Sequence, residues 1–347
     1  MKRFDFADAA KAIAIYFVIV GHAVSSRTEV FRFIFAFHMP FFFFISGYCF
    51  SEKSFAAGLG TFVKKRAKKM LVPYAVFAVI GFGIMLVFDS WKPGLSPFDF
   101  AMKYVYYTQP PALGQTWFLV ALLVASVLFY TAYRVASCFR GKARLLVYGM
   151  AMLLFAFVGS VICQIVNIPV FGRLPWKIDT ALTAVVFMMA GYAVKKTGFP
   201  EKPGLFFRAV LTVLLPVVVW FVSVKKNRYV NICDCIYGNI VYYYIGAIAG
   251  CLWVCLLGKW AEPVGWLCRL GKNSLPVFGI HSFVLWAWIR VYCKTITHVD
   301  EQHPAVSVFT LLIIPVLTYA CSVLFVPVYN KIMQCLKRET GTRPGDS

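Results

Sequence analysis

The chain has 347 residues, of which 61% are hydrophobic and only 14% are charged, against about 25% charged residues in a soluble domain. This composition excludes an ordinary soluble enzyme and predicts an integral membrane protein. The net charge of +21 does not predict a nucleic-acid partner, because Lys and Arg lie in short clusters between apolar runs, where membrane orientation and anionic lipids account for them.

Ten apolar runs are long enough to cross a bilayer, which takes about 20 helical residues. We expect helices, because backbone polar groups inside a bilayer have no water to bond with. The sequence therefore predicts an all-α polytopic bundle, with one transmembrane domain over 1–330 and a short cytoplasmic tail over 331–347. The predicted spans are 9–25, 31–50, 70–90, 115–135, 145–163, 178–195, 205–224, 237–258, 272–293 and 305–328.

The distribution of positive charge predicts that both termini are cytoplasmic. With that orientation the cytoplasmic segments hold 24 of the 35 Lys and Arg residues, while Asp and Glu divide equally between the two sides. We expect a multi-pass protein of the cell (plasma) membrane, surrounded by membrane lipids.

Eleven cysteines lie mostly inside the apolar runs, which is typical of small buried side chains rather than of a disulfide framework. Cys233 and Cys235 are the only close pair in a loop. No histidine or further cysteine stands at ligand spacing beside them, so we predict no metal site.

The first run contains AIAIYFVIVGHAV over 12–24, with a histidine where ionisable groups are costly and are therefore functional candidates. At 100° per residue, Asp8, Lys11 and His22 fall within about 80° of one another, and Lys11 and His22 are about 16 Å apart along the helix axis. Two interpretations stay open. These residues form one catalytic face, or Asp8 and Lys11 form an interfacial ion pair while His22 bonds to a neighbouring helix.

The second run, FAFHMPFFFFISGY over 35–48, places His38 at a depth similar to that of His22. Pro40 removes a backbone donor, so we predict that the helix opens there and lines a polar pocket. An imidazole whose ordinary pKa is about 6.5 suits general-base activation of a hydroxyl at neutral pH. His281 is the third intramembrane histidine, whereas His298 and His303 are expected to be solvated in an outer loop.

The segment FVKKRAKKMLVPY over 62–74 carries five cations in six residues, at the predicted start of the third span. One interpretation is a topogenic cluster of the kind that any cytoplasmic loop carries. The other is a phosphate clamp, in which Arg donates through its planar fork and Lys acts as a point charge.

Four blocks follow one another along the chain: DAAKAIAIYFVIVGH, FAFHMPFFFFISGY, KKRAKKMLVPY and KNSLPVFGIHSFVL. A weaker fifth block is TWFLVALL at 116–123. Together these blocks resemble the integral-membrane acyltransferase 3 family, in its branch of sugar and polysaccharide O-acetyltransferases. The resemblance implies an enzyme that moves an acyl group, usually acetyl, from cytoplasmic acyl-CoA to a hydroxyl of a glycan or lipid-linked sugar. It implies acetyl-CoA as a donor substrate and no bound cofactor.

The resemblance also implies roles for individual residues. His22 matches the essential histidine of the family, Lys11 its basic position, and His38 its FHMP block. Lys65, Arg66 and Lys69 match the motif thought to hold the donor phosphates. The weaker and the late blocks supply a candidate acceptor site of Trp117, Asn273 and His281. This chain departs from the family at Ala12, often Gly, and at Lys11, often Arg.

The mechanism expected from these matches is direct transfer. The basic residues hold the nucleotide end of acyl-CoA, and His22 deprotonates the acceptor hydroxyl while His38 or Asp8 orients the site. An acyl-enzyme intermediate stays open. The alternative from another class is a multi-pass transporter or flippase of a glycan or small solute, in which the histidines relay protons; the chain shows no inverted repeat of the kind that many transporters have.

Overall fold

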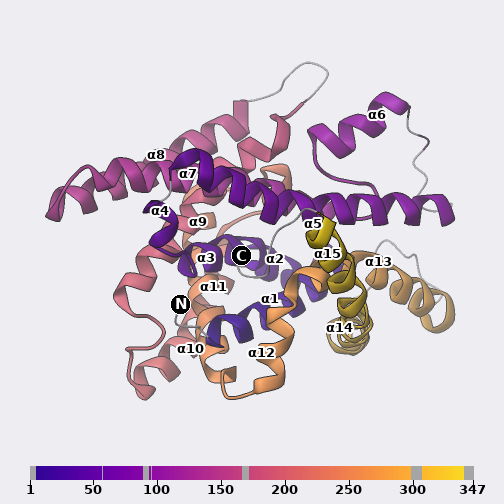
Figure 1. Cartoon of the computed structure of the whole chain (residues 1–347). Coiled ribbons are helices and arrows are strands. Elements are labelled where there is room, and N and C mark those ends of the chain that lie inside the picture. The colour runs from indigo at the N-terminus through magenta and orange to yellow at the C-terminus, as the bar shows by residue number, and fades with distance from the viewer. Residues whose placement is uncertain are drawn as a thin grey trace.

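The computed structural model describes residues 5–56, 58–88, 94, 96–165, 172–297 and 307–339. Within these ranges the chain is helical, without a strand apart from one isolated bridge between Asn231 and Ile236. Ten helical segments of the described part are long and apolar enough to cross a membrane, which confirms the polytopic all-α fold (Figure 1).

The helices that build these ten spans follow the chain in order. They are α1 (Asp5–Ala23), α2 (Glu29–Phe35) with α3 (His38–Tyr48), α5 (Leu59–Val87), α7 (Trp117–Ser137), α8 (Gly141–Ile165), α9 (Ile178–Thr197), α10 (Leu205–Val219), α11 (Ile240–Ala261), α13 (Ser274–Tyr292), and α14 (Ile314–Leu324) with α15 (Val326–Glu339). Three short helices connect them, namely α4 (Lys53–Ala56), α6 (Pro97–Ala101) and α12 (Gly265–Lys272).

The third span differs most from its prediction, because α5 begins at Leu59 rather than near residue 70. Lys, Arg and Ala all have high helix propensity, so the basic segment continues the apolar helix toward its N-terminus. The five cations therefore lie on a helix, not in a loop. At the other end of the chain, α15 crosses position 330. Positions 89–90, 305–306 and 340–347, together with His298 and His303, lie outside the described residues.

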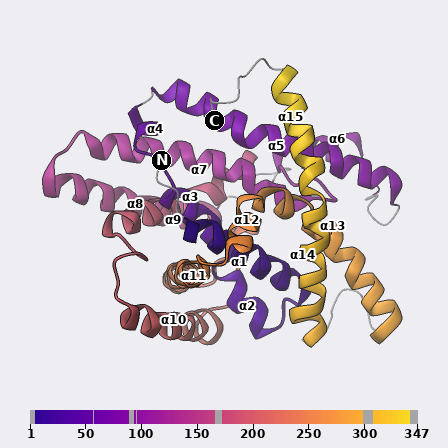
Figure 2. The ribbon, with the colours of Figure 1, turned by 60° about the horizontal axis from the view of Figure 1, so that its bottom comes forward.

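Two groups of helices differ sharply in burial. The spans Asp5–Ala23 and Pro175–Thr197, which contain α1 and α9, have 72% and 78% of their membrane-spanning windows buried, whereas Leu205–Lys226, which contains α10, has 6%. Figure 2 shows α10 at the outside of the bundle with α11 between it and α1. In the centre, α9 carries Asp179, which is 1% exposed and whose Oδ2 lies 2.8 Å from Nε of Arg173.

The central pair α3 and α9 packs backbone against backbone. A Cβ added at Gly47 would lie 2.0 Å from the carbonyl oxygen of Met188, and one added at Gly191 would lie 2.0 Å from that of Phe44. Small residues allow this approach, which in a membrane supplies packing that the hydrophobic effect cannot. Helix α3 is thereby held firmly at the centre of the bundle.

The alternating spans give the bundle two ends. At the basic end, α1 begins, α3 ends and the cations of α5 lie. At the histidine end, α1 ends, and α2, α7 and α9 begin.

Candidate active site

Three histidines from three separate helices meet near the histidine end. The ring of His22, in the last turn of α1, lies 6.2 Å from that of His38 at the start of α3 and 5.8 Å from that of His281 in α13, measured between centroids. The prediction that His22 and His38 share one depth is confirmed. We call these three residues the histidine cluster.

Main-chain carbonyls fix two of the three rings. Nδ1 of His38 lies 3.1 Å from the carbonyl oxygen of Ile34, and Nδ1 of His281 lies 2.6 Å from that of Phe278. A carbonyl only accepts, so in each neutral ring Nδ1 carries the hydrogen and Nε2 keeps its lone pair. Nε2 of His281 is buried and has no hydrogen-bond partner among the described residues. The cluster therefore presents basic nitrogens whose orientation is already set.

The break between α2 and α3 explains how His38 reaches this position. Pro40 has no N–H for the carbonyl of Ala36, and its ring would clash with that carbonyl in a continuous helix. The chain accordingly leaves the helix at Ala36 and Phe37, and the Phe37 N–H turns to the carbonyl of Ile34 at 3.1 Å. The predicted opening is present, and it lies just before Pro40 rather than after it.

Access to the cluster is uneven. The side chain of His22 is exposed, whereas His38 is only 3% and His281 0% exposed. Phe35 lies against both His22 and His38, with ring centroids 5.5 Å and 4.4 Å away. His22 is thus the one imidazole of the cluster that an incoming molecule reaches directly, while the other two support it from the interior.

The acid and base of the first helix lie away from this cluster. Nζ of Lys11 lies 3.1 Å from Oδ1 of Asp8, so the predicted interfacial ion pair is present. Asp8 precedes His22 by 14 residues of continuous helix, or about 21 Å of rise. The structure therefore does not bring Asp8 into contact with His22, whose ring instead lies near those of His38 and His281.

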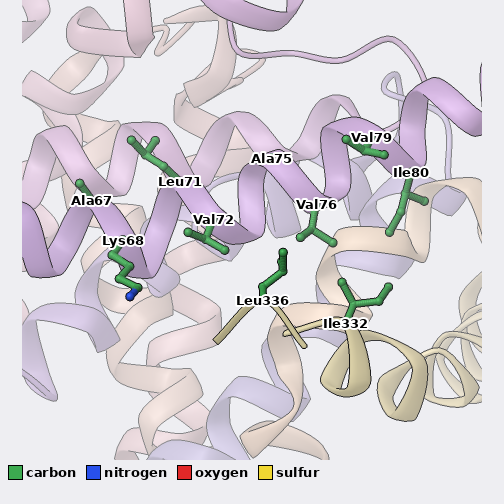
Figure 3. Close-up of a pocket in the computed structure, with 10 residues that line it drawn as sticks. All are labelled: Ala67, Lys68, Leu71, Val72, Ala75, Val76, Val79, Ile80, Ile332 and Leu336. Atoms are coloured by element: carbon green, nitrogen blue, oxygen red, sulfur yellow. The ribbon is translucent and has the colours of Figure 1, made fainter. Parts of the chain in front are cut away.

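The cations of α5 divide between two faces of the helix. At 100° per residue, Lys64 and Lys68 lie on one face, while Arg66 lies about 160° from Lys68. Lys68 lines an apolar groove of about 640 Å³ between α5 and α15, bounded by residues such as Val72 and Ile332 (Figure 3). The half-buried Arg66 instead places its guanidinium 4.7 Å from the ring centroid of Phe50.

The end of α3 gathers further positive charge. Lys195 donates to the carbonyl of Phe50 at 2.8 Å. Burial raises the pKa of the neighbouring Cys49 thiol, and the charges of Lys11, Lys195 and Lys69 act on it in the opposite direction.

Arg66 and Lys195 thus contact Phe50, and the charges of Lys11 and Lys69 act on the adjacent Cys49. We call these four residues the cation group. Lys195 was not among the sequence candidates. Its position at the end of a predicted span, as one of the Lys195 and Lys196 pair, resembled an ordinary topogenic charge. Lys65 is exposed on α5 beside the group.

The three acceptor candidates do not form one site. His281 belongs to the histidine cluster. Trp117 is 5% exposed at the start of α7, and the buried ammonium of Lys177 lies 5.9 Å from its ring centroid. Asn273 precedes His281 by eight residues, about 12 Å along α13, and donates to the carbonyl of Arg269 at 3.0 Å. It therefore lies toward the basic end.

A polar link between α13 and the short helical turn Gly114–Thr116, which precedes α7, was also not predicted from the sequence. The side-chain amide of Gln115 donates to the carbonyl of Gly279 at 2.7 Å and accepts from the Ser282 hydroxyl at 2.8 Å. These contacts flank His281 on both sides and hold its turn of α13 against the segment that precedes α7. Gln115 directly precedes the TWFLVALL block, but a single glutamine beside an apolar run gives no pattern from which its partner follows.

The described residues contain no group of three or more side chains that could hold a metal ion. Searches of curated proteins and of solved structures found no match. The acyltransferase 3 family, whose domain is described as an acyltransferase domain, matches residues 4–327, nearly the whole chain. The chain is therefore a multi-pass membrane member of the acyltransferase 3 family.

Proposed function

We propose that the protein is an O-acetyltransferase of the plasma membrane, which moves an acetyl group from cytoplasmic acetyl-CoA to a hydroxyl of a cell-envelope sugar or polysaccharide. The observation that carries the proposal is the contact of the exposed His22 with two buried imidazoles whose Nδ1 atoms are committed to carbonyls. This arrangement suits removal of a proton from a hydroxyl.

The cation group supports the donor side of the proposal. Both termini and the basic end face the cytoplasm in the orientation that the positive charges favour. The phosphates of acyl-CoA bind to Arg66 and Lys69, with the exposed Lys65 beside them. Further positive charge at the same site comes from Lys195 and Lys11. The rise of about 16 Å from Lys11 to His22 is comparable with the reach of a pantetheine arm.

The reaction follows from this placement. The acceptor hydroxyl gives its proton to His22 as its oxygen attacks the thioester carbonyl. A carbon–oxygen bond forms, the carbon–sulfur bond breaks, and CoA leaves as a thiolate that takes up a proton. His38 and His281 hold the ring of His22 in place and keep polar nitrogens beside the developing imidazolium. A glycan enters from the histidine end, where the exposed His22 lies.

Acetyl-CoA consumption distinguishes this function from transport. Purified protein in lipid nanodiscs, given acetyl-labelled acetyl-CoA and cell-envelope polysaccharide, should release free CoA only when the polysaccharide is present, with the label appearing on the glycan. The His22→Ala variant is the matched control and should bind acetyl-CoA without transferring acetyl. Movement of glycan across vesicles without CoA release would replace the proposal with a transporter.

A further inference from the structure

Two cysteines from distant parts of the chain meet at the histidine end. Cys163 lies in the last turn of α8, and Cys235 lies in the loop that precedes α11. Both sulfurs contact the first turn of α9: Sγ of Cys163 lies 3.5 Å from the carbonyl oxygen of Asp179, and Sγ of Cys235 lies 3.5 Å from Oγ1 of Thr180. The hydroxyl of Tyr237 lies 3.7 Å from Sγ of Cys163. Two adjacent residues of α9 therefore place the two sulfurs in the same small region.

The local fold holds Cys235 in this position. Its φ of 53° is a left-handed conformation, rare for a residue with a Cβ. Two main-chain hydrogen bonds between Asn231 and Ile236, of 2.7 Å and 2.9 Å, close the turn around it. Oγ1 of Thr180, in α9, lies 3.5 Å from its sulfur. The turn therefore points this thiol inward, toward α8 and α9.

The neighbouring Cys233 has a different environment although it is only two residues away. Its sulfur lies 3.5 Å from Nζ of Lys177, and burial raises the pKa of its thiol to about 12. The neighbouring thiol of Cys163 instead lowers the pKa of Cys235 to about 7. At neutral pH Cys235 is thus the more reactive thiol of the loop, because the thiolate is the nucleophile in disulfide exchange.

We propose that Cys163 and Cys235 form a disulfide in the mature protein, on the extracytoplasmic side of the membrane. The two thiols lose two protons and two electrons, the sulfur–sulfur bond forms, and an extracytoplasmic oxidant that carries a reactive disulfide is reduced to its dithiol. The histidine end lies on that side in the orientation that the positive charges favour, and extracytoplasmic compartments permit disulfides.

The bond would lock the loop that contacts the segment before α9 at the histidine end. The carbonyl of Cys233 accepts from Lys177 at 3.1 Å, and the carbonyl of Asp234 accepts from Arg173 at 2.7 Å. The two residues that precede Cys235 therefore hold the segment that leads into α9. A covalent tie from α8 to the loop would fix this edge of the entrance without touching the histidine cluster.

Peptide mapping tests the pairing directly. Cells are lysed in N-ethylmaleimide, and the purified protein is digested without reductant and analysed by mass spectrometry. We expect a cross-linked peptide that contains Cys163 and Cys235, which disappears on reduction, while the exposed Cys138 near the basic end is alkylated. Recovery of both Cys163 and Cys235 as alkylated thiols, or a bond from either to Cys233, would overturn the proposal.

A second measurement uses single variants and does not depend on acyl transfer. In Cys163→Ala the partner Cys235 should become alkylated, and in Cys235→Ala the reverse should hold. Dithiothreitol should lower the melting temperature of the wild-type protein by a few degrees and leave that of both variants unchanged, because a disulfide stabilises chiefly by restricting the unfolded chain. An equal response of wild type and variants to reductant would also contradict the bond.

Discussion

The histidine cluster and the cation group lie toward opposite ends of the bundle and are held in different ways. His38 and His281 are buried, and each has one ring nitrogen tied to a carbonyl at 3.1 Å or less. In the cation group, Arg66 and Lys195 contact Phe50, and Lys11 forms an ion pair with Asp8. In the proposed function, the fixed rings suit transfer of a proton, and the exposed or half-buried cations suit binding of a large polyanionic donor.

The comparison is tested most severely by removing His22. We expect His22→Ala to lower kcat by about 10²–10⁴-fold, the usual contribution of a general base, while the Kd for acetyl-CoA stays unchanged. Steady-state transfer and donor binding by calorimetry measure the two quantities. Wild-type turnover in this variant would remove His22 from the reaction.

The supporting rings should have a smaller effect. His281→Asn keeps a donor near the carbonyl of Phe278 but removes the Nε2 lone pair, so we expect kcat to fall by about 10–100-fold, with a changed pH profile. The readout is kcat against pH, because a merely structural role would lower the rate without moving the profile. An unchanged rate and profile would limit His281 to packing.

Helix α3 joins the two regions, since it begins at His38 and ends beside Phe50. Gly191→Ala would drive a methyl group into the backbone of α3, and overpacking of this kind costs about 1–3 kcal/mol of stability. Thermal unfolding in detergent measures the loss. Gly149→Ala is the matched control, because a Cβ there meets nothing within 4 Å and alanine favours a helix. Equal melting temperatures for the two variants would contradict the close packing.

The smallest effect is expected at the cation group. Arg66→Gln should raise the KM for acetyl-CoA about tenfold and leave kcat nearly unchanged, because a phosphate contact remote from the thioester binds ground and transition states alike. Lys64→Gln, on the opposite face of α5, is the control and should leave KM unchanged. A similar rise in both variants would mean that the cluster acts through net charge and orientation alone.

Much of the fold was readable because hydropathy is a strong signal over 20 residues, and ten spans follow from it. The depth of His22 and His38 followed from counting residues along two such spans. The start of α5 could not be predicted from hydropathy, because a lysine-rich segment has the low hydropathy of a loop although its residues favour a helix.

The contacts at the candidate site could not be predicted from the sequence for a different reason. The contact of His281 with His22, and the approach of Lys195 to Phe50, depend on how helices pack across long stretches of sequence. Periodicity within one helix carries no such information. Asn273 shows the converse, since it shares a sequence block with His281 yet lies more than two turns away from it.

The contrast in burial between α9 and α10 has a consequence for biosynthesis. The span that contains α10 has a mean hydropathy of 2.4, with Arg208 near its N-terminus, and can leave the translocon into lipid by itself. The span that contains α9 has a mean hydropathy of only 1.3, and its buried Asp179, Thr180 and Thr183 are costly to expose to acyl chains. Its main packing partner, α3, is made earlier and carries the matching Gly47. Because α3 is synthesised first, α9 can pack against it as soon as α9 is inserted. Helix α10 is synthesised later and joins the outside of the bundle.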